Sequence, residues 1–167
     1  MGRVPISILA LACTLAAASA LIHTTASAQS APAHTSHIVK PASELQWADL
    51  PSLPPGAKFV VLEGPMNQAV PFTARIRMPA NYRVPAHWHP AVERLSILSG
   101  TLHVGMGEKL ETAGTVALSS GGFTVMPPQS PHFVYTTDEP VELQLHGTGP
   151  WGITYLNPDD DPRRKLQ

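Results

Sequence analysis

Cysteine is almost absent from this sequence of 167 residues. The one cysteine, Cys13, lies in an N-terminal stretch that has the features of a cleavable export signal. A mature chain that begins after Ala28 therefore contains no thiol. This excludes disulfide bonds, thiolate metal sites, cysteine nucleophiles and dithiol redox chemistry. The folded part must rely on its hydrophobic core, and the rest of the chain is long enough to build one.

Charge is also sparse, because only 14% of the residues are Asp, Glu, Lys or Arg, and the net charge is −1. The largest basic cluster is the run Arg-Arg-Lys at 163–165, which closely follows three aspartates at 159–161. Nucleic-acid binding needs a larger and more continuous basic surface. We therefore expect no nucleic-acid partner.

A long, firmly apolar segment is missing as well. Residues 4–22 are apolar or small, but many are Ala, Ser or Thr, whereas a membrane span needs about 20 firmly apolar residues. Arg3 precedes this stretch, and the tripeptide Ala-Ser-Ala at 26–28 follows it, which is the pattern of a signal peptide. We expect cleavage near Ala28, a secreted or periplasmic protein, and no stable membrane association. A membrane anchor and a lipid anchor at Cys13 are the alternatives.

Long helical patterns are lacking, whereas proline and glycine are common, with 18 and 12 residues. They separate short apolar runs, which is typical of an all-β chain. In residues 70–78, for example, Phe72, Ala74 and Ile76 alternate with polar residues and share one face. Only residues 107–113 are compatible with a helix. About ten short strands predict a sandwich or a closed barrel; the candidate runs are residues 58–63, 70–78, 82–89, 93–98, 101–106, 115–119, 123–127, 132–137, 141–146 and 151–156.

These observations divide the chain into four parts. The parts are a signal peptide (1–28), a flexible leader and N-terminal segment (29–50), a folded β body (51–157) and a charged tail (158–167).

Three histidines and one glutamate in the β body are candidates for a metal site. His87 and His89 are two residues apart on a predicted strand, so their imidazoles lie on one face and can bind one ion. On the next strand, Glu93 shares its face with Leu95 and is therefore predicted to be buried. A buried carboxylate is costly unless it is paired or bound to a metal. His132 begins a later strand and could close the site across a barrel, although each histidine could instead be a hydrogen-bonded structural residue.

At these residues the sequence resembles the cupin superfamily. The first cupin motif has the form G-x5-H-x-H-x3-E-x6-G. His87, His89, Glu93 and Gly100 match it without a gap, and Asn81 stands in place of the first glycine. After glycine, asparagine is the residue that best tolerates the left-handed backbone conformation, so this departure from the motif is mild.

The second cupin motif has the form G-x5-P-x-G-x2-H-x3-N. Gly121, Pro127 and His132 match it, whereas Gln129 replaces a glycine and Thr136 replaces the asparagine. The change at Gln129 places the geometry of that turn in question more than the metal site.

The resemblance implies a double-stranded β-helix, which is a small jelly-roll barrel, over residues 51–157. It also implies that His87, His89, Glu93 and His132 bind one divalent metal ion per chain, such as Fe, Mn, Ni, Cu or Zn. The segment at 47–64 is more narrowly similar to single-domain cupins related to the sensor domain of ChrR-type anti-sigma factors.

Two functions follow from this resemblance as expectations. The first is a secreted metal-dependent oxidoreductase, dioxygenase-like, that acts on a small oxygenated organic compound. The alternative is a non-catalytic periplasmic protein that binds or senses a metal or a small-molecule ligand. Fold and ligand set do not choose between them.

Some further residues have weaker patterns. Gln144 and His146 alternate with leucines and point either outward or into the mouth of a pocket. Trp151 is predicted to be a core residue, and His103 is predicted to point outward without a role. Trp88 faces away from the imidazoles of His87 and His89 and is therefore predicted to lie outside the barrel or at a subunit contact. By analogy with other small single-domain cupins, we expect a homodimer.

Overall fold

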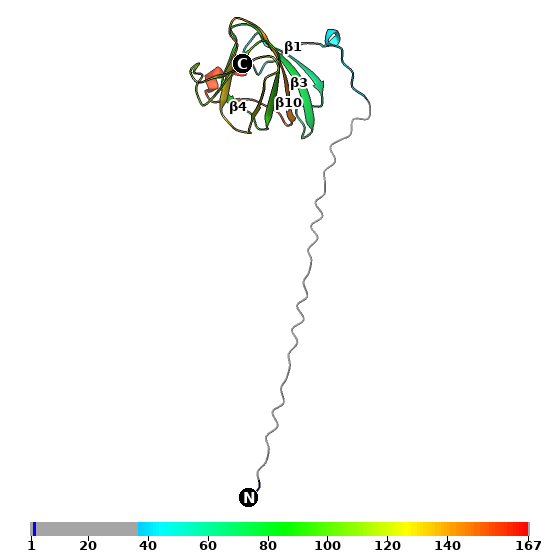
Figure 1. The fold of residues 1–167 in the computed structure, drawn as a ribbon, viewed down its shortest axis with the longest axis vertical. Coiled ribbons are helices and arrows are strands. Elements are labelled where there is room, and N and C mark those ends of the chain that lie inside the picture. The colour runs from blue at the N-terminus through cyan, green and yellow to red at the C-terminus, as the bar shows by residue number, and fades with distance from the viewer. Residues whose placement is uncertain (1, 3–36, 167) are drawn as a thin grey trace. The chain divides into compact units, whose positions relative to one another are not determined.

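The computed structural model describes Gly2 and residues 37–166 (Figure 1). The predicted signal peptide beyond Gly2, its cleavage site and residues 29–36 of the predicted leader lie outside the described residues. In the part of the chain that is described, no helix has both the length and the apolar character needed to cross a membrane.

Short strands make up almost all of the regular structure in residues 37–166. The helices among these residues are three single 3-10 segments, η1 (Ala42–Glu44), η2 (Pro158–Asp160) and η3 (Pro162–Leu166). The strands are β1 (Ala48–Asp49), β2 (Lys58–Glu63), β3 (Pro71–Met78), β4 (Arg83–Trp88), β5 (Glu93–Ser99), β6 (Leu102–Met106), β7 (Val116–Leu118), β8 (Phe123–Met126), β9 (His132–Tyr135), β10 (Val141–Thr148) and β11 (Thr154–Tyr155).

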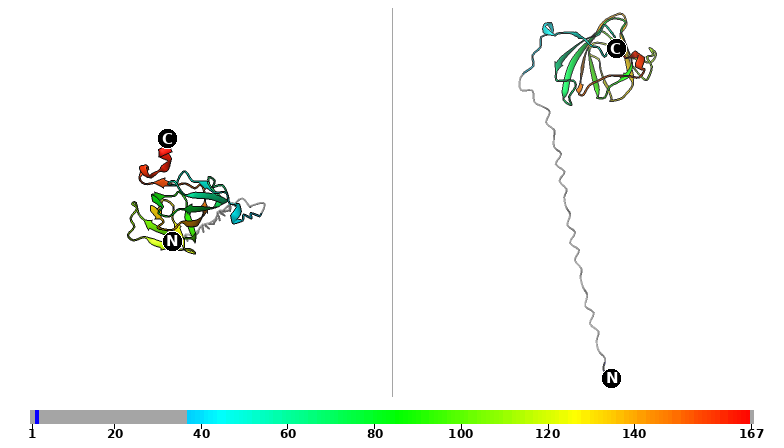
Figure 2. Two further views of the ribbon diagram at one scale, coloured as in Figure 1. Left: turned by 90° about the horizontal axis from the view of Figure 1, so that it is seen from above. Right: turned by 180° about the vertical axis from the view of Figure 1, so that it is seen from behind.

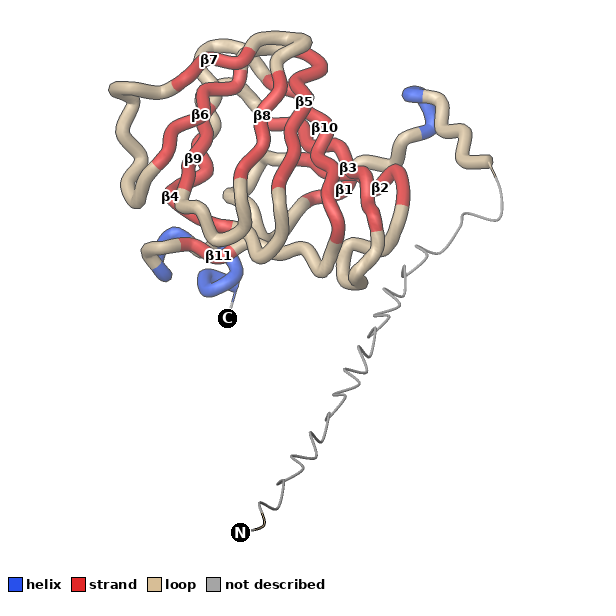
Figure 3. Tube along the Cα trace, turned by 60° about the horizontal axis from the view of Figure 1, so that its bottom comes forward, coloured by secondary structure: helices blue, strands red, loops and turns tan. Residues whose placement is uncertain are grey.

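The strands form two antiparallel sheets, with the orders β1-β2-β3-β10-β5-β8 and β11-β4-β9-β6-β7. The two sheets face each other (Figures 2 and 3), and buried side chains from both form one hydrophobic core. Strand pairs nest along the chain, because β3 pairs with β10, β4 with β9, β5 with β8 and β6 with β7. This nesting is that of a double-stranded β-helix. It confirms the predicted all-β jelly-roll fold.

The core follows from alternation along these strands. In β3 the side chains of Phe72, Ala74, Ile76 and Met78 are buried, and the residues between them are half-buried or exposed. Burying one large aliphatic or aromatic side chain contributes about 1.5–3 kcal/mol. Both sheets supply such residues, and the largest of those that are fully enclosed include Phe72, Ile97, Leu102, Leu143 and Leu145.

Strand β4 departs from strict alternation at the place where the candidate site begins. The register between β4 and β9 shifts between Val84 and His87. As a result, Ala86 and His87 are both buried although they are neighbours in the chain. A bulge of this kind rotates the following side chains and commonly occurs next to functional sites.

Other details differ from the sequence predictions. Residues 107–113, which were compatible with a helix, form none. The sheet begins earlier than residue 51, with β1. The charged tail contains η2 and η3, and Arg163 in this segment donates to the Asp161 carboxylate and to the backbone carbonyl of Ile153.

One glycine of β6 is required by a close contact. Gly105 lies directly opposite Phe133 in the pairing of β6 with β9, and the Phe133 ring is buried. A Cβ atom added at Gly105 would lie 2.1 Å from Cζ of Phe133, which is far inside van der Waals contact. The ring therefore covers the glycine and leaves no room for a side chain.

We expect the Gly105→Ala variant to unfold at lower urea concentration, with a free energy of unfolding lower by about 1–3 kcal/mol because the core becomes overpacked. Gly152→Ala is the matched control, because a Cβ atom at Gly152 meets nothing within 4 Å. Urea denaturation of the metal-free proteins, followed by circular dichroism, measures both. Equal losses in the two variants would contradict the contact with Phe133.

Candidate metal centre

Three separate parts of the fold bring the predicted ligands together. His87 lies in β4 and His89 directly after it, Glu93 begins β5, and His132 begins β9. His87 and His132 are register partners in the pairing of β4 with β9. All four side chains are buried, with at most 6% of each residue exposed.

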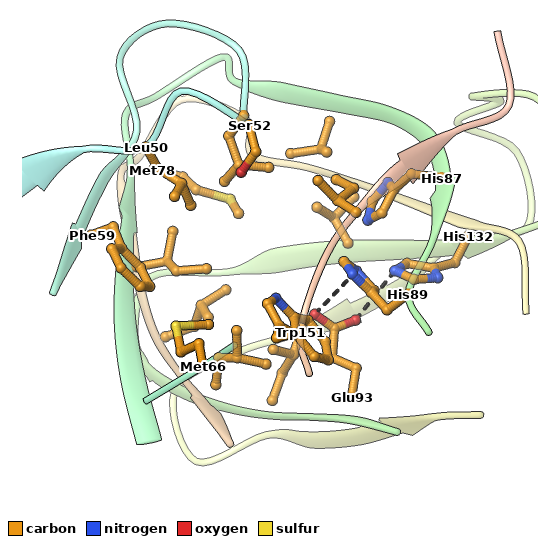
Figure 4. A pocket seen from close by; sticks show the side chains of 18 residues that line it. Leu50, Ser52, Phe59, Met66, Met78, His87, His89, Glu93, His132 and Trp151 are labelled. Atoms are coloured by element: carbon orange, nitrogen blue, oxygen red, sulfur yellow. Dashed lines mark ion pairs between the residues drawn. The ribbon is translucent and has the colours of Figure 1, made fainter. Parts of the chain in front are cut away.

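The four side chains converge on one point. The nitrogens that His87, His89 and His132 can offer lie within 4.8 Å of one another. Glu93 completes the cluster, because its Oε1 atom is 3.6 Å from Nε2 of His89 and its Oε2 atom is 3.2 Å from Nε2 of His132. Figure 4 shows the three imidazoles and the carboxylate at one end of a cavity.

Backbone carbonyls orient all three imidazoles. Nδ1 of His87 lies 2.7 Å from the carbonyl oxygen of Pro85, and Nδ1 of His132 lies 3.0 Å from that of Ser130. Nδ1 of His89 lies 2.6 Å from the carbonyl oxygen of Gly152. Because a carbonyl only accepts, each neutral ring carries its proton on Nδ1 and has a lone pair on Nε2. This arrangement is the one that histidine ligands of metals adopt.

The inner side of the cluster lacks hydrogen donors. Nε2 of His89, Nε2 of His132 and Oε2 of Glu93 are buried and have no hydrogen-bond partner. Two acceptor atoms 3.2 Å apart, as in the contact between His132 and Glu93, repel each other unless a cation or a proton lies between them. The residues therefore fit a divalent cation, which would satisfy all of these lone pairs at once.

Burial and mutual proximity set the protonation of the cluster. Burial, with smaller contributions from His132 and His89, lowers the pKa of His87 to about 3. Burial also lowers the pKa of His89. Burial alone would raise the pKa of Glu93, but the nearby His89 and His132 hold it below its ordinary value. At neutral pH, His87 and His89 are thus neutral and Glu93 is ionised, which are the forms that bind a cation.

His132 is the member of the cluster whose pKa rises. Burial lowers the pKa of His132, but the Glu93 carboxylate outweighs burial and raises it above the ordinary value. Of the three histidines in the cluster, His132 thus binds a proton most readily, on the Nε2 atom that faces Glu93.

At two positions where the cupin motifs have glycine, this chain has another residue. The backbone at both positions still adopts the left-handed conformation that favours glycine. Asn81 and Gln129 both have φ of 58°, which is the left-handed region. The turn at Gln129 joins two ligands, because its N–H donates to the His89 carbonyl and the next residue, Ser130, accepts from His132. The replacement of glycine at 129 therefore leaves the turn geometry intact.

Thr136, which stands where the motif has asparagine, has a structural role. Its hydroxyl donates to the carbonyl of Pro79 over 2.7 Å and accepts from the N–H of Tyr82 over 2.9 Å. The residue is buried and connects the start of β4 to the end of β9. It is not part of the ligand cluster.

Trp151 belongs to the site, although the sequence pattern assigned it to the core. Its indole stacks on the His89 ring, with centroids 4.3 Å apart and planes 16° from parallel, and it also contacts Phe72. Trp151 is half-buried and lines the cavity next to the cluster. Trp151 lies three residues before β11, whose partner in the sheet is the histidine-bearing β4, so the stack follows from strand pairing and no local sequence pattern indicates it.

Residues outside the cluster occupy distinct places. Gln144 and His146 lie on the opposite face of β10 from Leu143 and Leu145, and only the two leucines line the cavity, so the structure places neither polar residue in the pocket. Gln144 instead meets Arg75 on the outer face. His103 stacks on Tyr135 away from the cluster.

Family comparison agrees with this geometry. A family model described as a ChrR cupin-like domain matches residues 35–151. The chain belongs to this cupin family. The match includes both cupin motifs and all four converging side chains. No curated protein matches the sequence.

The fold of this chain is similar to several solved structures. The polyketide cyclase RemF from Streptomyces resistomycificus has a TM-score of 0.61 at 13% identity, over 77% of this chain and 92% of that chain. The DMSP lyase DddQ from Ruegeria pomeroyi has a TM-score of 0.57 at 22% identity, over 70% and 64%. An RmlC-like cupin from Shewanella frigidimarina has a TM-score of 0.54 at 14% identity, over 68% and 93%. At such low identity the likeness shows the fold alone.

The left-handed turn at residue 129 generates a stability prediction. The left-handed conformation destabilises a residue that has a Cβ atom by about 1–2 kcal/mol, and it does not destabilise glycine. Glycine in turn loses about 0.5–1 kcal/mol more conformational entropy on folding than alanine does. Gln129→Gly should therefore raise the free energy of unfolding by up to about 1 kcal/mol. Asn81→Gly should gain less, because asparagine tolerates this conformation.

Gln129→Ala is the control, since it shortens the side chain but keeps the Cβ atom that causes the strain. Urea denaturation of the three variants and the parent protein measures the effect. If Gln129→Gly is no more stable than Gln129→Ala, the turn does not hold the left-handed conformation in solution.

Proposed function

We propose that the chain is a secreted, metal-binding cupin that holds one divalent ion through His87, His89, Glu93 and His132 and acts on a small oxygenated organic compound. The observation that supports this most strongly is the set of inward-facing acceptors without donors. Three Nε2 lone pairs and a carboxylate gather at one end of a largely apolar cavity.

The ligand set restricts the metal to a group of ions. Imidazole with carboxylate suits Fe, Mn, Ni, Cu or Zn in the divalent state. An ion held by these four residues would still accept a substrate and dioxygen or water. A bound ion would supply Lewis acidity and, if it is redox-active, electron transfer.

The protein's own residues supply positioning and a proton acceptor. Backbone carbonyls and the Trp151 indole fix the orientation of the imidazoles. The carboxylate of Glu93 is the only acidic group that lines the cavity, so it is the residue that would take a proton from a bound substrate. Aliphatic side chains such as Leu143 and Leu145 exclude water from that exchange.

The reaction class that we favour is oxidation of the dioxygenase type. A cavity with one ionisable cluster and otherwise apolar walls offers a dry place for an electron-rich organic compound beside a metal. Among the residues that line this cavity, no cysteine or lysine is available for nucleophilic catalysis.

A non-catalytic periplasmic binding or sensing protein is the second candidate. The family match to a ChrR cupin-like domain favours it. In this case the metal would be structural or would anchor a ligand. The two candidates differ in whether the ion exchanges external ligands and consumes oxygen.

The secreted location is part of the proposal and rests on the N-terminal sequence pattern. Protein purified from the periplasm or the medium of the native host would carry the metal that the compartment supplies. This source is the appropriate one for the measurements below.

We expect His87→Ala and His132→Ala each to lower bound metal from about one ion per chain to less than about a tenth of that, because each removes one of four ligands. His103→Ala is the control, since His103 stacks on Tyr135 outside the cluster. Metal content after dialysis, measured by mass spectrometry, reads out the result. Equal loss in all three variants would show that the site assignment is wrong.

We expect the native metal form to consume dioxygen with at least one compound from a panel of diketones, flavonols and catechols, and to bind azide or nitric oxide at the ion. Oxygen-electrode traces and optical titration measure these two properties. A protein that holds no redox-active metal and takes up no oxygen would remove the dioxygenase proposal and favour the binding or sensing function.

A further inference from the structure

The cavity beside the cluster has two chemically distinct ends. It measures about 230 Å³, and every ionisable side chain in its lining belongs to the cluster of His87, His89, Glu93 and His132. Beyond these, the polar groups in the lining side chains are the hydroxyl of Ser52 and the indole N–H of Trp151. All other lining side chains are aliphatic, aromatic or methionine.

The apolar end lies away from the cluster. In Figure 4, Phe59, Met66 and Met78 occupy the side of the cavity opposite the imidazoles. Methionine side chains are flexible and polarisable, so they adapt to apolar groups of different shape. Trp151 lies between the two ends, with one face on His89.

This lining restricts the body of any bound molecule. A charged or polyhydroxylated group at the apolar end would lose its hydration and gain at most the Ser52 hydroxyl as a side-chain partner, so its binding is disfavoured. The volume is also below the range of about 300–1,000 Å³ that is usual for drug-sized ligands. Cationic, sugar-like and dicarboxylate bodies are therefore disfavoured, and so are large ones.

On the basis of the proposed metal site, we infer that the substrate is a small amphipathic molecule with one chelating oxygen group and an uncharged apolar body the size of one ring or a short chain. The chelating group meets the cluster at one end. The apolar body lies against Phe59, Met66 and Met78 at the other end. Met66 is a specificity-determining residue, because its side chain lies at the apolar end and is not part of the ligand cluster.

Three hydroxamates with the same chelating head test this inference. They are benzohydroxamate with an apolar ring, acetohydroxamate with a methyl group, and glycine hydroxamate with an ammonium group. Their dissociation constants are measured by calorimetry on the full protein loaded with Zn(II), after its metal content has been determined. We expect benzohydroxamate to bind at least about tenfold more tightly than acetohydroxamate, and glycine hydroxamate to bind most weakly.

Met66→Lys places a cation at the apolar end and should weaken benzohydroxamate at least about tenfold, while acetohydroxamate changes less than about twofold. Met106→Lys is the matched control, because Met106 is 60% exposed on the outside of β6 and lines no part of this cavity. Metal content and circular dichroism report whether each variant is folded, and Met66→Gln replaces Met66→Lys if the lysine variant does not fold.

Each other outcome overturns the inference in a recognisable way. Equal affinity for the three probes, tightest binding of glycine hydroxamate, or no effect at Met66 would show that the apolar end does not select the body. Metal-loaded protein that binds none of the probes would refute the inference while leaving metal binding intact. A protein that binds no metal would refute the proposed function as well.

Discussion

The site depends on one constraint, which is the placement of the proton on each imidazole. Backbone carbonyls of Pro85, Ser130 and Gly152 accept from the Nδ1 atoms of the three histidines. The Nε2 lone pairs are therefore directed into the cluster, and those of His89 and His132 meet the Glu93 carboxylate. Acceptors that face one another in a buried place repel, and the fold keeps them together because its strands and turns hold each ring from behind. A divalent cation would remove this repulsion.

The jelly-roll topology brings these groups together from distant parts of the chain. Nested pairing places β4 beside β9, so His87 and His132 become direct neighbours across two strands. The bulge in β4 turns the His87 side chain inward beside Ala86. The left-handed turn at Gln129 then connects the carbonyl of His89 to the segment that begins with His132. The geometry of the cluster is thus a consequence of backbone pairing and not of the local sequence around any one ligand.

The cavity gives the site its chemical character. The family match and the similar solved structures establish a cupin, and cupin-fold proteins such as a polyketide cyclase and a DMSP lyase show that the barrel accommodates different reactions. In this chain the side chains around the cluster are almost all apolar. The end formed by the histidine and glutamate cluster and the apolar end together favour a ligand that is polar at one point only.

The sequence by itself determined the strand pattern and the fold class, because alternation along β3 and the frequent proline and glycine residues are local properties. It also predicted that His87, His89, Glu93 and His132 lie together, since the motif spacing is local except for the fourth residue, and the structure brings these four side chains together. Tertiary structure decided what local pattern cannot express. The sequence predicted Trp151 only as core, and its stack on His89 depends on how β11 pairs with β4. The alternation of β10 allowed two orientations for Gln144 and His146, and the sheet pairing placed them on the outer face. Side-chain direction near a site is set by bulges and strand partners far away in the chain, and for that reason the lining of the cavity could be read only from the folded molecule.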